Sequence, residues 1–386
     1  MHVVVLGAGY AGVTLARKLE SLLPNNVELT LIDESETHLV QHEVHRAIRR
    51  PSITDAIEIP LSTLFDRAEI ITDRVAAVDT ERNQVSLESG DTVHYDYAGV
   101  CLGAETAYYG LDGLEAHALP LKSVTDAEAI RKQALDVIDS GEQARFVVGG
   151  AGLSGVQVAG ELATLTAEED AADRIDILVV EQLDSVAPAF PEAFQAALED
   201  ELTDRGIELW TETAVERATD SAIETRNEST GDEQSVGYDL FVWTGGIGGS
   251  AVMAGDRPVV QSDLRLNKST FAVGDAAKIV DANGEAVPAS AAAAIRSARV
   301  AADSIASLVE WDLDEREGFE PRLAQFRFDA PGWIVSVGDG AVAQVGPKVV
   351  TGSSAKLLKA SVGAGYLSSV RAIRQATELV GEELNA

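Results

Sequence analysis

The chain has 386 residues, of which 46% are hydrophobic, so it is long enough for two or three domains with substantial cores. It carries 63 Asp and Glu against 30 Lys and Arg, a net charge of −33 that argues against nucleic acid as a partner. The acidic residues are dispersed rather than gathered in one tail, which favours a solvated coat in a salt-adapted organism over an acidic partner-binding surface.

The first predicted unit is a strand, a glycine-rich loop, a helix and a second strand. An apolar run at residues 3–6 is followed by the loop Gly7-Ala8-Gly9-Tyr10-Ala11-Gly12, and residues 13–22 have helical apolar spacing. Residues 27–32 predict a second strand, which ends at Asp33. Because the first strand begins almost at the start of the chain, we expect no targeting peptide and a cytoplasmic protein.

Residues 70–102 contain short alternating runs separated by turn residues, a pattern that predicts an antiparallel meander leading to Gly103. The only cysteine, Cys101, lies in an apolar run that predicts a buried strand, and we interpret it as a small core residue. A single cysteine excludes an intramolecular disulfide, a dithiol redox pair and a cysteine cluster for zinc or iron–sulfur.

The same order of elements then repeats, which indicates a duplicated architecture. A strand at 145–148 precedes the loop Gly150-Ala151-Gly152-Leu153-Ser154-Gly155, a helix at 156–165 follows, and a strand at 175–180 ends at Glu181.

Alternating segments continue to the pair Gly245-Gly246, after which an apolar run ends in Gly274-Asp275. We expect this turn to head a helix, and we predict an Ala-rich helix over residues 289–308. From about residue 327 the chain is strand-like and then helical.

Each glycine loop is typical of dinucleotide binding. The first glycine permits a tight turn, the second lets backbone N–H groups approach a pyrophosphate, and the third lets the helix pack closely on the strand. The helix N-terminus then faces the phosphates, and the acid that ends the next strand accepts hydrogen bonds from a ribose. Because both loops have this whole context, we predict two dinucleotide sites.

The later residues indicate which loop holds which cofactor. At the head of a helix, Asp275 is placed to bond the ribityl chain of a flavin, although an isolated Asp there would be read as a helix cap. Glu181 is followed by Gln182 and Leu183, with no Arg to receive a 2′-phosphate. That pattern favours NADH over NADPH.

At these residues the chain resembles flavoproteins with two dinucleotide-binding domains. It is most similar to the type II NADH dehydrogenases (NADH:quinone oxidoreductases) of the FAD-dependent pyridine nucleotide-disulfide oxidoreductase superfamily. The resemblance covers nearly the whole chain, and its most specific block is residues 149–162. Its other carriers are residues 7–12, 31–33 with His38, 121–127, 243–246 and 272–277.

The resemblance implies an α/β fold with two Rossmann-like domains in a glutathione-reductase-like arrangement, plus a C-terminal membrane-associating segment. The NADH domain would be inserted in the FAD domain. The implied boundaries are 1–118 and 256–326 for the FAD domain, 119–255 for the NADH domain and 327–386 for the C-terminal segment.

The resemblance also implies site residues. FAD would be held by Gly7, Gly9, Tyr10, Ala11, Gly12, Asp33, Gly103, Gly274, Asp275 and Ala291. NADH would be held by Gly150, Gly152, Gly155, Glu181, Gly245 and Gly246, the last two near the nicotinamide. Glu161 matches a carboxylate that lies beside the reacting rings in this family, although taken alone it would be a solvated or capping acid on a helix.

The implied function is hydride transfer from NADH to FAD and then transfer of two electrons to a membrane quinone, without proton pumping. Family members usually carry an Ala-Gln pair after a Pro and a Thr, whereas here Ser290 replaces the Thr and Ala292 the Gln. Two alternatives stay open: a soluble NADH-dependent reductase of a small iron–sulfur or rubredoxin-like protein, and an NADH-sensing flavoprotein that turns over poorly. Solvent or a nearby carboxylate could protonate the quinol.

Residues 341–377 contain no Asp or Glu but five Lys and Arg, and their apolar residues recur at roughly helical spacing. This pattern predicts a helix in the surface of an anionic membrane, and hence a peripheral protein on the inner face of the cell membrane. The alternative is a helix docked on the FAD domain or on a second subunit, so a homodimer stays open. No apolar run is long enough to span a bilayer.

His38, His42 and His45 have spacings of 4 and 3, which would place them on one face of a helix. We predict no metal site, because no second cluster of ligands accompanies them. A position in the flavin lining and a plain surface position are both favoured over metal binding.

Overall fold

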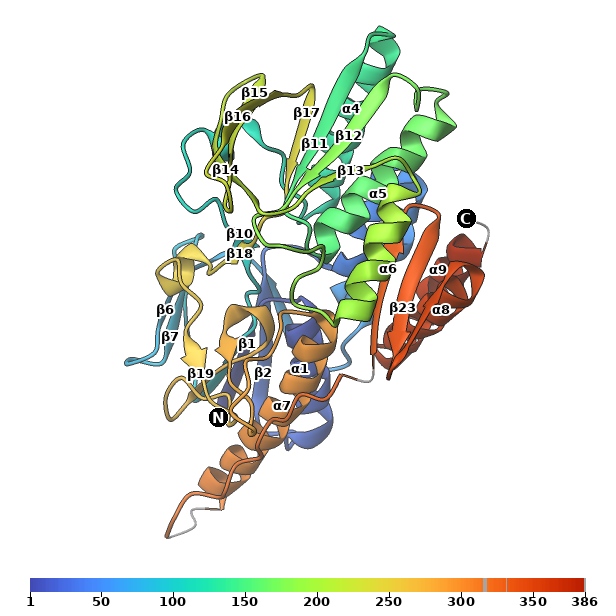
Figure 1. The fold of residues 1–386 in the computed structure, drawn as a ribbon. Coiled ribbons are helices and arrows are strands. Elements are labelled where there is room, and N and C mark those ends of the chain that lie inside the picture. Colours follow the sequence, from blue (N-terminus) through green and yellow to red (C-terminus); the bar gives the residue numbers. More distant parts are fainter. Residues whose placement is uncertain (315–317, 331, 385–386) are drawn as a thin grey trace.

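The computed structural model describes residues 1–314, 318–330 and 332–384. Its first sheet is parallel and has the order β20-β9-β1-β2-β5. These strands are β1 (His2–Leu6), β2 (Glu28–Asp33), β5 (Glu69–Thr72), β9 (Tyr97–Val100) and β20 (Thr270–Ala272). Helices α1 (Tyr10–Leu22) and α7 (Ala291–Leu313) pack against each other and on this sheet (Figure 1). The chain therefore returns to its first sheet after a long excursion.

That excursion builds a second parallel sheet of order β13-β12-β11-β17. Its strands are β11 (Ala144–Gly149), β12 (Ile175–Val180), β13 (Glu208–Trp210) and β17 (Leu240–Trp243). Continuous apolar runs such as residues 177–180 of β12 and the whole of β17 are typical of parallel strands buried on both faces. The helices of this lobe are α4 (Val124–Ser140), α5 (Leu153–Glu168) and α6 (Glu192–Thr203), and a capping box of Ser123 and Asp126 starts α4.

Small antiparallel sheets accompany the two parallel ones. They are β6 (Val75–Asp79), β7 (Gln84–Leu87) and β8 (Thr92–His94), and β14 (Thr213–Ala218), β15 (Ala222–Asn227) and β16 (Glu233–Gly237). The lobes are joined where β10 (Glu105–Thr106) pairs antiparallel with β18 (Ile247–Gly248). Shorter elements are β3 (Thr37–Leu39), β4 (Glu58–Pro60), β19 (Val259–Val260), β21 (Lys278–Ile279), α2 (Thr54–Ile57), α3 (Leu114–His117), η1 (Gln41–Ile48), η2 (Pro51–Ile53), η3 (Leu61–Thr63) and η4 (Ala251–Met253).

The predicted α/β class is confirmed, but the single meander predicted over residues 70–102 is wrong at both ends. Strands β5 and β9 belong to the parallel sheet, and only β6 to β8 form the meander. Every residue of β9 is buried, so its neighbours on both sides are strands of the sheet core. The buried Cys101 follows this strand directly, and burial raises the pKa of its thiol.

The helix predicted at the Gly274-Asp275 turn is a single 3₁₀ turn, η5 (Gly274–Ala276). It stops because the next residues form β21, which pairs with β19. The Ala-rich helix is α7, which starts two residues later and ends five residues later than predicted. Its start is set by Ser290, whose hydroxyl accepts a hydrogen bond from the backbone N–H of Ala293 at 3.2 Å.

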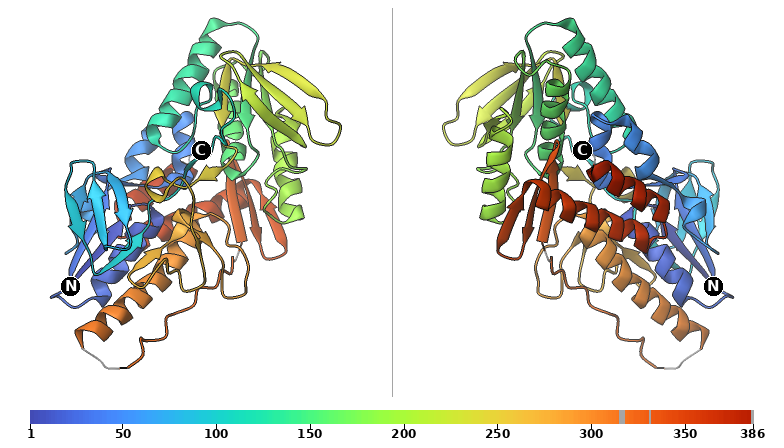
Figure 2. Two further views of the ribbon diagram at one scale, coloured as in Figure 1. Left: turned by 90° about the vertical axis from the view of Figure 1, so that its left-hand side faces the viewer. Right: turned by 90° about the vertical axis from the view of Figure 1, so that its right-hand side faces the viewer.

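The C-terminal segment forms an antiparallel sheet of β22 (Gly332–Val337), β23 (Gly340–Val345) and β24 (Lys348–Thr351), followed by α8 (Gly352–Ser369) and α9 (Ile373–Leu384). Figure 2 shows this unit lying along one side of the molecule. Strand β22 packs on α5 of the second lobe. A Cβ at Gly160 would lie 2.4 Å from the backbone nitrogen of Gly338, so the two backbones meet where only glycine fits.

Candidate dinucleotide-binding sites

The first glycine loop joins β1 to α1. Gly7 has a φ of +94°, and a Cβ there would lie 2.4 Å from the carbonyl oxygen of Cys101. A Cβ on Gly12 would lie 1.7 Å from the carbonyl oxygen of Gly7, so no side chain fits between helix and loop. At Gly9, by contrast, an added Cβ meets no atom within 4 Å. This open space is where the second glycine of such a loop lets a pyrophosphate approach the backbone.

The second loop joins β11 to α5 and repeats these relations. Gly150 also has a φ of +94°, and a Cβ there would lie 2.6 Å from the Cα of Gly245. A Cβ on Gly155 would lie 1.9 Å from the carbonyl oxygen of Gly150, whereas one on Gly152 meets nothing within 4 Å. The fold therefore brings Gly245, expected near the nicotinamide, against the first glycine of this loop. The adjoining Gly246 has a φ of +155°.

The acids at the ends of β2 and β12 bind their loops in the same way. The backbone N–H of Ala8 donates to the Asp33 carboxylate, and that of Ala151 donates to the Glu181 carboxylate at 2.7 Å. Burial raises the pKa of Asp33. Both acids stand beside the open position of their loop, where a ribose hydroxyl could reach their remaining lone pairs.

The other residues expected to hold FAD gather at the same edge of the first sheet. A Cβ on Gly274 would lie 3.0 Å from the Cβ of Ala11 on α1 and 3.1 Å from the Cβ of Ala294 on α7. The N-termini of two helices therefore converge at η5, and Ala291 is the first residue of α7. Gly103 follows β9, the strand next to β1, and has a φ of +69°. Helix N-termini that meet in this way favour an anionic ligand.

Asp275 has a partly buried carboxylate that makes no hydrogen bond or ion pair with any residue that the structure describes. Burial raises its pKa, while the charges of Arg257 and Lys122 oppose that shift. The Lys122 ammonium also forms no ion pair with a described residue, and burial lowers its pKa. An acid and a base left unpartnered beside two helix N-termini fit the polar chain and phosphates of FAD.

Glu161 lies on α5 and is 0% exposed, which excludes the solvated and capping alternatives. Its Oε2 accepts a hydrogen bond from Arg49 Nε at 2.8 Å, and Arg49 also donates to Glu168 at 2.8 Å. The other oxygen, Oε1, has no hydrogen-bond partner among the described residues and lies 3.9 Å from His45 Nε2. Burial raises the pKa of Glu161, although Arg49 works against it. Arg49 therefore fixes one carboxylate oxygen, and the other oxygen can still accept a hydrogen bond or carry a proton.

Buried charges continue from this acid to the C-terminal helix. Lys359 on α8 donates to Glu43 Oε2 at 2.9 Å, and Arg46 donates to the same oxygen at 3.2 Å. Burial alone would raise the pKa of Glu43, but Lys359, His42 and Arg46 bring it well below its usual value. Lys359 belongs to the basic residues predicted to face a membrane. The structure corrects that expectation, because its side chain is buried against an acid that lies 316 positions earlier in the chain.

Tyr10 does not point away from the protein at the first loop. Its hydroxyl bonds His42 Nδ1, and its ring meets that of Tyr366 edge-on at 4.9 Å. Tyr366 in turn bonds His38 Nε2 at 2.8 Å. His38 and His45 are buried, so a surface position is wrong for both. In the described part of the chain no group of three or more potential ligands forms a metal site.

His38 should make the apoprotein sensitive to acid. Its Nδ1 bonds the carbonyl oxygen of Ala8 at 2.7 Å, and burial lowers its pKa from 6.5 to about 4. Between these values the unfolded chain binds a proton that the folded one does not, so the free energy of unfolding falls as the pH drops through this window. The free energy of unfolding falls by about 1.4 kcal/mol for each pH unit within this window. Denaturant titrations from pH 7 to roughly 4 should show a shallower fall for His38→Asn, and an unchanged one for the exposed control His117→Asn.

The sequence pattern gives no role to Arg49 or Lys122, and it places Tyr366 and Lys359 on a membrane-facing helix rather than in the interior of the protein. Lys122 lies within residues 121–127, one of the segments that carry the family resemblance. A signal was present in residues 43–50, where four charged side chains lie among apolar ones in a short segment. Charges so close to apolar neighbours indicate paired burial rather than a solvated face.

The chain is similar to known proteins along most of its length. A model described as pyridine nucleotide-disulphide oxidoreductase matches residues 1–298. The type II NADH:quinone oxidoreductase of Staphylococcus aureus is 25% identical over 385 residues, which cover 92% of each chain. The solved structure of NDH2 from Plasmodium falciparum with NADH has a TM-score of 0.84 at 14% identity, over 98% of this chain and 97% of that one. A ferredoxin reductase from Rhodopseudomonas palustris reaches 0.71 at 19% identity, over 89% and 82%.

Proposed function

This chain belongs to the pyridine nucleotide-disulphide oxidoreductase family, and from that premise we propose that it is an FAD-dependent NADH dehydrogenase that reduces a quinone. The observation that carries the proposal is the pair of glycine loops, each with an open second glycine and with an acid that accepts a hydrogen bond from the backbone N–H of the residue before that glycine. The type II NADH:quinone oxidoreductase that shares 92% of its length with this chain supports the same activity.

The first loop would hold FAD. Gly9 would admit the pyrophosphate to the N-terminus of α1, Asp33 would bind the ribose, and Asp275 would bind the ribityl chain. FAD, when bound, supplies the ring that accepts a hydride and passes on two electrons. Lys122 lies near Asp275 and would neutralise negative charge at this site.

The second loop would hold NADH. Gly152 would admit its pyrophosphate, and Glu181 would accept hydrogen bonds from its adenosine ribose. A 2′-phosphate would approach this carboxylate unfavourably, so NADH should be oxidised much faster than NADPH. Because Gly245 lies against Gly150, the loop after β17 would border the nicotinamide and help to exclude water.

Glu161 would stand beside the reacting rings and hold a proton for the acceptor at Oε1. Arg49 fixes the other oxygen, so the side chain cannot turn away from its site. Burial raises the pKa of Glu161, which is the direction that a proton donor near neutral pH needs. Arg49 would be a positioning residue, and it also joins Glu161 to the exposed side of α5 through Glu168.

Glu161→Gln should separate the two half-reactions. Reduction of the flavin by NADH needs no proton from this acid, so its rate should change little in stopped-flow absorbance. Quinone-dependent turnover should fall by about 100-fold, the lower range for loss of a general acid. Glu168→Gln is the matched control, since it removes the exposed partner of Arg49 and should leave turnover within about twofold. A fall in flavin reduction alone would contradict the assignment.

The acceptor is tested by steady-state NADH oxidation with a soluble short-chain quinone, compared with a rubredoxin-like or small iron–sulfur protein. Rapid oxidation with the quinone supports the proposal. NADH oxidation only with the iron–sulfur or rubredoxin-like protein would indicate that the chain is a soluble reductase of such a protein. Flavin reduction by NADH without reoxidation by either would indicate an NADH-sensing flavoprotein. Ala292 at the start of α7 makes this comparison necessary, because the usual glutamine is absent there.

We also propose that α8 and α9 contact a membrane surface at the inner face of the cell membrane. Leu357, Val362 and Ile373 are 60%, 55% and 65% exposed, and Arg374 lies beside the last of them. The two helices lie together on one side of the molecule (Figure 2). None of the described helices is long and apolar enough to cross a bilayer. Helix α8 contains no acidic residue, and exposed apolar side chains with basic neighbours suit an interfacial contact.

This contact is narrower than the predicted apolar stripe. Val370 is buried and Tyr366 is bonded to His38, so these residues hold the helix on the protein. A Leu357→Ser/Val362→Ser/Ile373→Ser variant should lose cosedimentation with lipid vesicles. If it instead changes the molecular mass in solution, the same face is the contact of a homodimer.

A further inference from the structure

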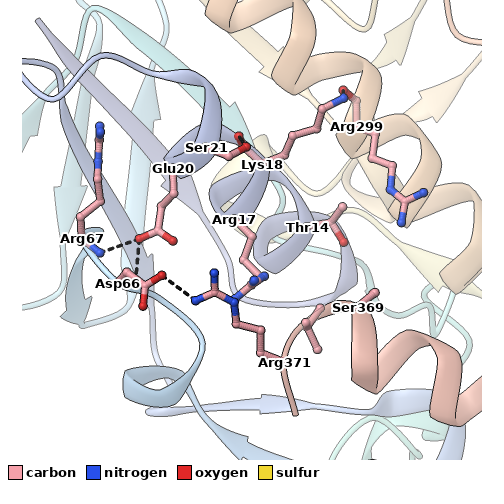
Figure 3. A pocket seen from close by; sticks show the side chains of 11 residues that line it. Thr14, Arg17, Lys18, Glu20, Ser21, Asp66, Arg67, Arg299, Ser369 and Arg371 are labelled. Atoms are coloured by element: carbon pink, nitrogen blue, oxygen red, sulfur yellow. Dashed lines mark hydrogen bonds and ion pairs between the residues drawn. The ribbon is translucent and has the colours of Figure 1, made fainter. Parts of the chain in front are cut away.

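A cavity of about 450 Å³ lies beside α1, and none of the residues that line it belongs to either glycine loop. Figure 3 shows its walls, which come from α1, the chain around Asp66, helix α7 and the turn between α8 and α9. Its charged lining residues are Arg17, Lys18, Arg67, Arg299 and Arg371 against Glu20 and Asp66. In a chain with a net charge of −33, this local excess of positive side chains is the reverse of the general pattern.

Some of these lining residues make contacts within the protein that hold the cavity wall in place. Glu20 Oε1 accepts hydrogen bonds from three consecutive backbone N–H groups, at residues 66–68, which fixes the turn beside α1. The Arg67 guanidinium points away and donates to backbone carbonyls at the end of α1. Lys18 is paired with Asp303 at 2.6 Å. These contacts make the cavity a preformed feature of the fold rather than a gap between loose side chains.

Three guanidinium groups remain around the cavity. Arg17 and Arg371 converge on each other from opposite walls (Figure 3), and Arg371 also meets Asp66 at 2.6 Å. Arg17 donates to the carbonyl oxygen of Leu64, which holds its side chain in place. Burial and the charge of Arg371 lower the pKa of Arg17, so the positive charges are crowded. Arg299 on α7 is exposed and has no ion pair with a described residue.

We propose that this cavity binds a phosphate-bearing anion, with the guanidinium groups of Arg17, Arg299 and Arg371 as its ligands. Guanidinium forks match phosphate oxygens in paired hydrogen bonds. Those of Arg17 and Arg371 are drawn together in Figure 3, and Arg299 adds positive charge from the α7 wall. An anion between Arg17 and Arg371 would also relieve their mutual repulsion. The volume lies within the range of small-molecule sites.

The phosphate has two possible sources. It is either the phosphodiester of an anionic phospholipid or a soluble phosphate ester. The lipid source rests on the membrane contact proposed above, because the rim of the cavity includes Arg371, two positions before the exposed Ile373. The soluble source does not depend on that contact, so the two are separable by experiment.

The test compares the full chain with Arg299→Gln/Arg371→Gln and with a matched control, Arg82→Gln/Lys132→Gln, which removes two exposed cations elsewhere. Binding is measured by calorimetry with glycerol phosphate and by cosedimentation with phosphatidylglycerol or phosphatidylcholine vesicles. The cavity variant should lose about tenfold or more in affinity, while the control stays within about twofold of the original chain. Thermal unfolding should be alike in all three.

Binding of glycerol phosphate that the cavity variant loses identifies a soluble ligand. Loss confined to phosphatidylglycerol vesicles identifies the lipid. Equal losses in the cavity variant and the control, or no binding of either probe by the original chain, would overturn the site. Turnover with NADH and a short-chain quinone should be unchanged in both variants. Failure of the proposed function would appear instead as absent quinone turnover in the original chain, whatever the cavity binds.

Discussion

Gly9→Ala will give a folded protein that purifies without its yellow cofactor, whereas Gly152→Ala will stay yellow and lose affinity for NADH. Both glycines have a negative φ, −69° and −64°, and an added Cβ meets no protein atom within 4 Å. The new methyl group therefore costs the apoprotein little. The methyl group occupies the space through which a pyrophosphate reaches the backbone. Each variant should therefore bind its cofactor about 100-fold more weakly, a loss of about 2.7 kcal/mol in binding free energy.

The measurement is flavin absorbance after gentle purification, followed by titration of FAD into each apoprotein and of NADH into each reconstituted protein. Gly381→Ala on α9 is the control, because its added Cβ also meets nothing within 4 Å. Loss of flavin from Gly152→Ala with full retention in Gly9→Ala would reverse the assignment of the two loops. Unchanged binding in both variants would remove the basis of the proposed function.

Lys359→Met will lower the free energy of unfolding by about 3–5 kcal/mol, the usual cost of leaving one member of a buried ion pair without its partner. The effect arises at Glu43, which is 1% exposed and would lose Lys359 while it keeps Arg46 and His42 near its carboxylate. Chemical denaturation should report the change as a lower midpoint with an unchanged slope.

Lys359→Met/Glu43→Gln should recover part of that loss, because the uncompensated charge is then removed as well. Lys132→Met is the control, since its pair with Asp136 is exposed and should be worth less than about 1 kcal/mol. An effect of Lys359→Met no larger than that of the control would mean that the pair is solvated in solution. A large effect means that the C-terminal helices are part of the core fold, so deleting them would not isolate membrane binding.

The glycine loops were predictable because their requirements are local. Gly12 is required by its contact with Gly7 in the same loop, and Gly7 is favoured by its own φ of +94°, and such local requirements leave a fixed spacing in the sequence. The acids that end β2 and β12 follow for the same reason, since parallel neighbours end at one edge of a sheet. The domain boundaries and the roles of individual site residues stay predictions that the variants above test.

What could not be predicted depends on segments that are distant in the sequence. The partner of Lys359 is Glu43, and no local pattern distinguishes this lysine from the exposed basic residues around it. No local pattern separates strand β9 from the meander strands, because its place in the parallel sheet depends on β20, which pairs with it about 170 residues later. The 3₁₀ turn at Asp275 was expected to be a longer helix because the competing strand pair, β19 with β21, is too short to leave a pattern.

The pairing of β10 with β18 has a consequence for how the enzyme works. The chain crosses between the lobes twice, and the two crossings are hydrogen-bonded to each other rather than running as separate tethers. Trp243 Nε1 donates to the carbonyl oxygen of Ala107 at 2.9 Å, which braces the same junction. Two crossings that are hydrogen-bonded to each other restrict the relative motion of the two lobes more than two independent linkers would. We therefore expect donor and acceptor rings to be aligned by the architecture itself, with no swinging of one lobe toward the other in each catalytic cycle.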